Sequence, residues 1–318
     1  MTLPLLSIIT PSFNREAMIR EAIESVQKQD YQPFEHIIVD GASTDGTLET
    51  LRGYSHLKVI SEPDHGMYDA INKGLQKASG EVIGLLNTDD WYPLQTFATV
   101  ASAFQAHPDA MAIVGGTQIF SVHSGERRLV RENPPIQPAE FWYRVIKGAP
   151  VTNAWFFRRE VFQRVGLMNT NYRFAADREF LIRLALAGIR PEPVDSVLYH
   201  YRQHAGSATI GSQGSRDPQR GEQRLLVLEE GMHLLEGFLD QDDIPSEARY
   251  FLKSAHSTAC YRATMTALYH RHIKTGIHAI RLGFRYDPLW PFIFLTLFWN
   301  RILQELNRDL PGEGNTPH

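Results

Sequence analysis

Short apolar runs alternate with helical periodicities along the first half of the chain. Runs rich in β-branched residues, each with the length of a buried strand, lie at 5–10, 36–40, 57–61, 81–87, 110–120 and about 153–158. Apolar spacings of three and four predict helices at 15–29, 47 onward, 68–78, 94–107, 159 onward and 176–188. Strands and helices in this alternation predict an α/β fold with parallel strands joined by right-handed crossovers.

The pattern changes in two later regions of the chain. Residues 121–138 are polar and contain proline, which predicts a loop or hairpin. Residues 205–224 are rich in Gly, Ser and charge, and the chain beyond them is largely helical in pattern. We therefore expect an α/β domain over 1–204, a flexible linker over 205–221 and a helical extension over 222–318.

Composition excludes some classes of protein. The 318 residues carry a formal net charge of −4, which gives no reason to expect a nucleic acid partner. An anionic ligand would need local positive groups or a metal. A single cysteine, Cys260, cannot form a disulfide within the chain, which fits a reducing compartment. No signal peptide is expected at the N-terminus, and the longest apolar run, 289–299, is too short to span a bilayer. We expect a cytoplasmic location.

Polar residues follow three of the predicted strands. Thr10–Pro11, Asp40 and Asp89–Asp90 each lie at the carboxyl end of an apolar run. Ligands of open parallel sheets bind beyond the carboxyl ends of the strands. These segments are therefore expected to converge on one crevice.

The adjacent acids Asp89 and Asp90 suggest a cation site. Two neighbouring carboxylates are costly to ionise unless positive charge lies beside them. Mg²⁺ and Mn²⁺ prefer oxygen ligands and commonly share their shell with phosphate oxygens. The alternative is a solvated turn that caps the next helix.

Asp40 occupies the position from which an acid can accept hydrogen bonds from a nucleotide base or ribose. It lies in the segment Val39-Asp40-Gly41-Ala42-Ser43-Thr44-Asp45-Gly46-Thr47. We expect a ligand-binding role for Asp40. Asp45 and Gly46 are better explained as the cap and turn that begin the following helix.

The chain resembles the family 2 glycosyltransferases, which are inverting enzymes with the GT-A fold. The resemblance is carried in order by IITPSFNR (8–15), IIVDGASTDGT (37–47), INKGLQKASGE (71–81) and IGLLNTDDW (83–91), with a fainter match at FAADREFLIRLALAG (174–188). It is clear over 5–92 and weaker to about 204. It implies a mostly parallel central sheet, a nucleotide-sugar-binding half over 1–92 and an acceptor half over 93–204.

The resemblance also implies roles for individual residues. The nucleotide-sugar would be bound by Thr10, Pro11, Asn14, Asp40, Asp64, Asp69, Lys73, Asn87 and Asp89. Asp89 matches the metal-binding acid of the family's Asp-X-Asp motif, with Asp90 beside it, and His200 or His204 would add a metal or diphosphate contact. Asp177 falls where the family places its catalytic base; the alternative is that it caps its helix or pairs with Arg178 or Arg183.

Two positions depart from the family pattern. Asn87 replaces the first acid of the Asp-X-Asp motif, so metal coordination would depend on Asp89 and Asp90. Ala70-Ile71-Asn72-Lys73-Gly74 stands where many members have Ala-Arg-Asn-X-Gly. Lys73 either replaces that arginine or is a solvated helix residue, and the second reading is favoured.

The implied reaction transfers a sugar from a UDP-, GDP- or dTDP-sugar to a saccharide or lipid-linked saccharide, with Mg²⁺ or Mn²⁺ as cofactor. This is a hexosyltransferase-like activity. The run DHGMYD (64–69) resembles a subgroup linked to bacterial surface-polysaccharide synthesis. In that setting Asp64 would meet the nucleotide and Asp69 would face the sugar.

The C-terminal third leaves two interpretations open. Arg271, Lys274, Arg281 and Arg285 precede the aromatic run WPFIFLTLFWNR. Such a segment can lie on a membrane surface, with peripheral contact through 285–305 on the inner face, or can pack within the protein. Packing is slightly favoured.

Two other functions remain as alternatives. A nucleotidyltransferase shares the α/β class and a metal, but usually has a Gly-rich basic loop after the first strand. TPSFNREA lacks glycine and has a single arginine. A non-catalytic nucleotide-sugar-binding protein would bind the donor without turnover.

Overall fold

The computed structural model describes residues 3–123, 126–148, 150–204 and 218–308. The chain divides into two compact units, Met1–Gly214 and Ser215–His318. The strands of the first unit are β1 (Leu6–Ser12), β2 (Phe34–Asp40), β3 (Leu57–Ser61), β4 (Val82–Leu85), β5 (Ala112–His123), β6 (Glu126–Asn133), β7 (Trp155–Arg158) and β8 (Glu192–Gln203). Its α-helices are α1 (Ile19–Gln27), α2 (Thr47–Arg52), α3 (Met67–Lys77), α4 (Thr96–Ala106), α5 (Phe141–Ile146), α6 (Glu160–Val165) and α7 (Ala176–Leu186). Short 3₁₀ turns lie at Pro138–Glu140 and Thr152–Ala154.

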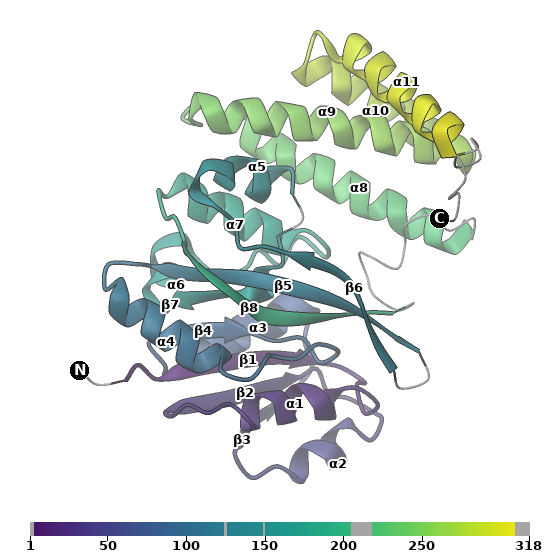
Figure 1. Ribbon diagram of the computed structural model, residues 1–318. Helices are drawn as coiled ribbons and strands as arrows, with labels where there is room; N and C mark the ends of the chain where they lie inside the picture. The colour runs from purple at the N-terminus through teal and green to yellow at the C-terminus, as the bar shows by residue number, and fades with distance from the viewer. Residues whose placement is uncertain (1–2, 124–125, 149, 205–217, 309–318) are drawn as a thin grey trace, which may run out of the picture. The chain divides into compact units, whose positions relative to one another are not determined.

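One mixed sheet organises the first unit (Figure 1). Its strand order is β3-β2-β1-β4-β7-β5-β6, and β8 pairs with β5. The first four strands are parallel, β7 is antiparallel to both neighbours, and β8 is parallel to β5. The predicted α/β class is confirmed. The carboxyl ends of β2, β1 and β4 meet at one edge, because these strands run in the same direction.

Side chains alternate between the two faces of the sheet, and each face is covered by helices. Phe156 of β7 contacts Tyr92, in the loop before α4, and Phe97, in the first turn of α4. The next residue, Phe157, points to the opposite face and meets Phe162 of α6 and Phe180 of α7. This two-sided burial explains why the central strands β1, β4 and β7 are largely apolar in sequence.

Gly74 brings α3 close to the sheet. A Cβ atom at this position would lie 2.4 Å from the Cγ2 atom of Ile9 in β1. Any larger residue would therefore push the helix away from the strands. The close approach holds α3 against β1 and β2, at Ile9 and Val39.

Some elements differ from those expected from the sequence. The region 121–138 contains β6, which forms an antiparallel hairpin with β5, so the hairpin alternative was the right one. The sequence pattern did not predict β8 or α5. β8 mixes buried, half-buried and exposed positions and includes Pro193 and Asp195, which obscure a strand pattern. Most of the expected linker, 205–217, lies outside the described residues, and α8 begins at Pro218.

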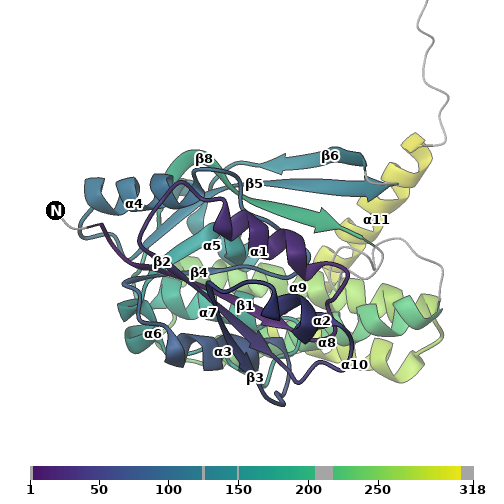
Figure 2. The same ribbon diagram turned by 90° about the horizontal axis from the view of Figure 1, so that it is seen from below.

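The second unit is helical, as seen in Figure 2 in green and yellow. It contains α8 (Pro218–Leu239), α9 (Ser246–Tyr269), α10 (Ile273–Tyr286) and α11 (Trp290–Arg308). Its core includes Met232, Cys260, Ala279 and Trp290. A Cβ atom on Gly283 would lie 2.4 Å from the Trp290 ring, so glycine permits this packing. Within the described residues, none of the helices has the length and apolar character needed to cross a bilayer.

Candidate active site

Asp90 anchors the loop that follows β4. Its side chain is 1% exposed. The Tyr199 hydroxyl donates to Oδ2 over 2.6 Å, the Arg202 backbone N–H donates to Oδ1 over 2.7 Å, and the Asn87 amide donates to Oδ2 over 3.3 Å. Burial and the charge of neighbouring Asp89 raise the pKa of Asp90. These contacts give Asp90 and Asn87 a structural part in the loop and leave Asp89 as the more accessible acid.

Asp89 faces a histidine at the end of β8. Its Oδ2 atom lies 2.9 Å from Nε2 of His204, and the two side chains are 23% and 22% exposed. The structure therefore brings together one carboxylate oxygen and one imidazole nitrogen that solvent can reach.

His200 lies in a different environment from His204. Its ring packs between Trp91 and Phe120, with ring centroids 5.2 and 5.1 Å away. Burial and nearby Arg127 lower the pKa of His200 to about 4. Of the two histidines considered as metal contacts, the structure places His204 against Asp89 and keeps the ring of His200 in an aromatic cluster.

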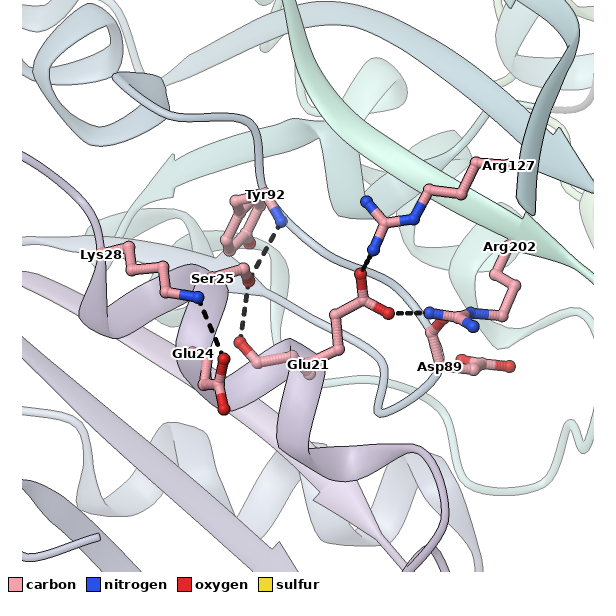
Figure 3. Close-up of polar contacts among 9 residues, drawn as sticks. Glu21, Glu24, Ser25, Lys28, Asp89, Tyr92, Arg127 and Arg202 are labelled. Carbon is pink, nitrogen blue, oxygen red and sulfur yellow. Dashed lines mark hydrogen bonds and ion pairs between the residues drawn. The ribbon is translucent and has the colours of Figure 1, made fainter. Parts of the chain in front are cut away.

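A carboxylate from α1 connects three elements next to the acidic loop (Figure 3). Glu21 accepts from the guanidinium groups of Arg127 in β6 and Arg202 in β8. The Arg202 Nε–H also donates to the Asp89 carbonyl oxygen over 2.8 Å. Both guanidinium groups lie over Trp91, at 4.3 and 5.3 Å from its ring centre. Glu21 thus holds the arginine that fixes the backbone of Asp89.

Asp40 organises the loop after β2. It is fully buried, and its oxygens accept from the Ser43 backbone N–H over 2.9 Å, the Ser43 hydroxyl, and the Ser61 hydroxyl over 2.9 Å. A Cβ atom on Gly41 would lie 2.5 Å from Oδ2 of Asp64. The side chain of Asp64 therefore lies against the glycine that follows Asp40.

The residues expected near the nucleotide in β1 and the loop after it differ in burial. Thr10 and Pro11 are buried, and the Thr10 hydroxyl lies 3.0 Å from Nε2 of His36. Asn14 is exposed, has a positive φ of 51°, and accepts from the Thr44 backbone N–H through its side-chain oxygen. This bond joins the loop after β1 to the loop after β2.

The start of α3 carries the remaining donor-site candidates. Oδ1 of Asp64 accepts from the Gly66 backbone N–H, and Oδ2 of Asp69 accepts from that of His65. Lys73 donates to the Pro63 carbonyl oxygen over 2.7 Å and pairs with Glu62 at 2.9 Å. Lys73 is thus engaged with its own loop in the structure.

Asp177 lies in the first turn of α7. Its Oδ1 accepts from the Arg178 backbone N–H over 2.7 Å, and a hydrogen bond joins its side chain to that of Tyr68 in α3. Burial raises the pKa of Asp177. Arg183 pairs with Glu179. The hydrogen bond to Tyr68 places Asp177 beside the helix that follows the Asp64 loop, and its raised pKa suits a base.

The donor set at Asp89 suits a divalent cation that also binds phosphate. Within the described ranges, no group of three or more His, Cys, Asp or Glu side chains is arranged to hold a metal. Asp89 and His204 supply one oxygen and one nitrogen, a pair that Mn²⁺ accepts. Their fit therefore depends on further ligands from a diphosphate or water.

Several residues of this site had no signal in the sequence. Glu21 and Arg127 lie in no recognisable motif, and Tyr199 and Arg202 lie in the run LYHYRQH, in which the histidines are the residues typical of metal binding.

Proteins similar to this chain in sequence include glycosyltransferases. The model of the family described as "Glycosyl transferase family 2" matches residues 7–166. A protein of Mycobacterium bovis named "PGL/p-HBAD biosynthesis glycosyltransferase" is 30% identical over 196 residues, covering 58% of this chain and 70% of that protein. The uncharacterized glycosyltransferase EpsJ of Bacillus subtilis is 28% identical over 222 residues, covering 65% of this chain and 63% of its own length.

Solved structures share the fold. TarS 1–349 of S. aureus in complex with UDP-GlcNAc aligns with a TM-score of 0.54 at 18% identity, covering 88% of this chain and 91% of that one. The mannosyltransferase PcManGT from Pyrobaculum calidifontis, in complex with GDP-Man and Mn²⁺, aligns with a TM-score of 0.55 at 20% identity, covering 93% and 86%. The first unit thus has the architecture of a GT-A enzyme.

Proposed function

The chain belongs to glycosyl transferase family 2, and from this membership we propose that it transfers a sugar from a nucleoside diphosphate-sugar to an acceptor hydroxyl with inversion at the anomeric carbon. The observation that carries the proposal is the Asp89–His204 pair at the carboxyl edge of the sheet. UDP-GlcNAc and GDP-Man, bound by the two structural neighbours, support a donor of this class.

Asp89 and His204 would hold a divalent cation, Mg²⁺ or Mn²⁺. The Mn²⁺ in the complex of PcManGT supports this cofactor. A bound cation would neutralise charge that develops on the leaving diphosphate. The protein's own part is to fix Asp89, through the Arg202 bond to its carbonyl oxygen and the Asp90 contacts next to it.

Asp177 would remove the proton from the acceptor hydroxyl. Its raised pKa keeps the carboxylate basic enough to accept that proton, and the bond to Tyr68 orients it. Asp64 and Asn14 would flank the nucleoside from the loops after β3 and β1, and buried Asp40 would hold the loop after β2 in place beside it. The acceptor in this proposal is a saccharide or lipid-linked saccharide, used in bacterial polysaccharide or glycan assembly.

The proposal is tested by donor turnover. The purified chain is mixed with UDP-, GDP- and dTDP-sugars and Mn²⁺, with and without a pool of saccharide and lipid-linked acceptors, and released nucleoside diphosphate is measured. We expect one donor to be consumed, and chelation of the metal to stop the release. Asp89→Asn should lower the rate by at least about a hundredfold, whereas Asp109→Asn, on an exposed loop after α4, should leave it unchanged.

The other functions give different results, the first in a parallel assay supplied with a nucleoside triphosphate and a sugar phosphate. Release of pyrophosphate from a nucleoside triphosphate and a sugar phosphate would indicate a nucleotidyltransferase. Binding of a nucleotide-sugar with no release from any donor would indicate a non-catalytic protein. Either result would overturn the proposal.

A further inference from the structure

The outer face of α11 is apolar and exposed. Phe292, Leu295 and Trp299 are 69%, 61% and 61% exposed. Their spacing places them on one face of the helix. The opposite face is already used, because Trp290 is 3% exposed and packs its ring 5.1 Å from that of Phe294. Helix α11 therefore packs on one face and leaves a second apolar face open.

Helix α10 carries an apolar row beside a basic row. Ile273, Ile277 and Phe284 are 63%, 46% and 52% exposed and share one face. The basic row next to them on the helix surface consists of Lys274, Arg281 and Arg285, all exposed. Arg285 lies 3.9 Å from Asp240 in a solvent-exposed ion pair, which contributes little. A helix with adjoining apolar and basic surfaces is suited to the interface of a membrane.

The charge of this segment is opposite to that of the whole protein. Residues 270–300 contain four Lys or Arg residues and a single Asp, whereas the full chain has a formal net charge of −4. Exposed large hydrophobic residues of the described chain gather in the same segment, from Tyr269 to Trp299. Exposed apolar residues at this density indicate an interaction site, and the positive charge of the segment complements an anionic partner.

We propose that α10 and the exposed face of α11 bind an anionic lipid surface. Phe292, Leu295 and Trp299 would enter the boundary between head groups and acyl chains. Lys274, Arg281 and Arg285 would pair with lipid phosphates. Because no described helix is apolar and long enough to cross a bilayer, the segment would lie on the membrane. The proposal does not depend on the sugar transfer, although a lipid-linked acceptor would be presented at such a surface.

Sedimentation with vesicles tests the proposal directly. The full chain is mixed with vesicles of phosphatidylcholine alone and of equal parts phosphatidylcholine and phosphatidylglycerol. We expect binding to the anionic vesicles only, weakening as salt is raised. The double substitution Phe292→Ser with Trp299→Ser should weaken binding by about tenfold or more. Tyr250→Ser, which alters an exposed aromatic residue on α9 (68% exposed), should bind as the unaltered chain does.

A second pair of variants separates the charge from the apolar face. Lys274→Gln with Arg281→Gln should also weaken binding to anionic vesicles by about tenfold, while Lys253→Gln, exposed on α9, should have little effect. Thermal melting of each variant checks that the helices remain folded. If this surface serves only to bind lipid, these variants release nucleoside diphosphate from a soluble donor at the normal rate. Failure of the lipid-binding proposal can therefore be told apart from failure of the transferase proposal.

Three results would overturn the proposal. The first is that the chain does not bind anionic vesicles, and the second is that the Phe292/Trp299 variant binds them as tightly as the unaltered chain. The third is a dimer, seen by analytical ultracentrifugation, that this variant dissociates, because a second copy of the chain then covers the face.

Discussion

The acids at the carboxyl edge of the sheet differ in their accessibility. Asp40 and Asp90 are buried and bonded to neighbouring side chains and backbone, whereas Asp89 is 23% exposed beside His204. Burial of an acid within a hydrogen-bond network fixes the backbone around it. Asp40 and Asp90 therefore shape the two loops, and Asp89 is the acid that remains available to a ligand.

Asp177→Asn should remove sugar transfer and leave donor binding intact. Loss of a general base lowers kcat by about 10²–10⁴-fold. The carboxylate must be ionised to act, and burial raises its pKa from the ordinary 3.8. Transfer by the unaltered chain should therefore fall as pH drops through a value above 3.8. Steady-state kinetics over pH, with donor affinity measured by calorimetry, checks both parts.

Asp177→Glu provides the matched control for this variant, because it keeps the carboxylate and should retain part of the rate. An Asp177→Asn enzyme that transfers sugar at the normal rate would remove Asp177 from the mechanism. A variant that loses donor affinity and rate together would instead indicate a role in binding.

His36 should make stability depend on pH. Burial, with a contribution from His56, lowers the pKa of His36 from 6.5 to about 3. The unfolded chain takes up a proton below pH 6.5 that the folded chain does not, so stability present above 6.5 is lost as pH falls toward 3. The slope for one such proton is up to about 1.4 kcal/mol per pH unit.

Urea unfolding of the unaltered chain and of His36→Gln at pH 7 and pH 5 measures this effect. The free energy of unfolding should fall less in the variant between these two values. Keeping the pH at 5 or higher limits the contribution from the titration of Glu35. Burial opposes ionisation of Glu35, but hydrogen bonds from Lys58, Ser7 and Ser79 lower its pKa to about 2. Equal losses in the two proteins would contradict the assignment to His36.

At the scale of elements, α1, β6 and β8 meet at one carboxylate. Glu21 accepts from Arg127 and Arg202, and Arg202 in turn bonds to the Asp89 carbonyl oxygen. Burial and the charge of Arg202 lower the pKa of Arg127, which indicates that the two cations are crowded. The carboxylate of Glu21 relieves this repulsion and holds both strands to the helix.

Glu21→Gln should therefore weaken the use of metal by the enzyme. A residue that orients a metal ligand through another typically changes metal affinity by about 10–100-fold, and the low end is expected because Glu21 acts through Arg202. The Mn²⁺ concentration for half-maximal donor turnover measures the effect. Glu24→Gln is the control one turn along α1, since Glu24 pairs with Lys28 at 3.0 Å on the helix surface (Figure 3). An unchanged Mn²⁺ requirement in Glu21→Gln would contradict the positioning role.

The elements that the sequence could predict are those with strong local patterns. The runs at 36–40 and 57–61 correspond to β2 and β3, and the helix at 68–78 corresponds to α3. The link from Glu21 to Arg202 joins residues 181 positions apart, so no local pattern contains it. The sequence did not show which of His200 and His204 lies against Asp89. The difference arises because β8 ends at Gln203, so His204 no longer follows the alternation of side chains that holds His200 among the aromatic rings.

At the scale of the whole molecule, positive charge is local. The chain has a formal net charge of −4. Arg127 and Arg202 gather by the acidic loop of the first unit, and a separate basic row lies on α10 of the second. Long-range attraction of an anionic donor by the net charge is therefore not expected. Recognition of a diphosphate would instead depend on these nearby groups and a cation.

The central claim is that Asp89 and His204 hold a cation that binds the diphosphate. Diffraction from crystals grown with Mn²⁺ and either UDP or GDP tests it most directly, because manganese is located by its anomalous signal. The account predicts a manganese peak in contact with the Asp89 carboxylate, the His204 imidazole and the nucleotide's diphosphate. A peak at any other acids, or a diphosphate bound away from Asp89, would contradict it.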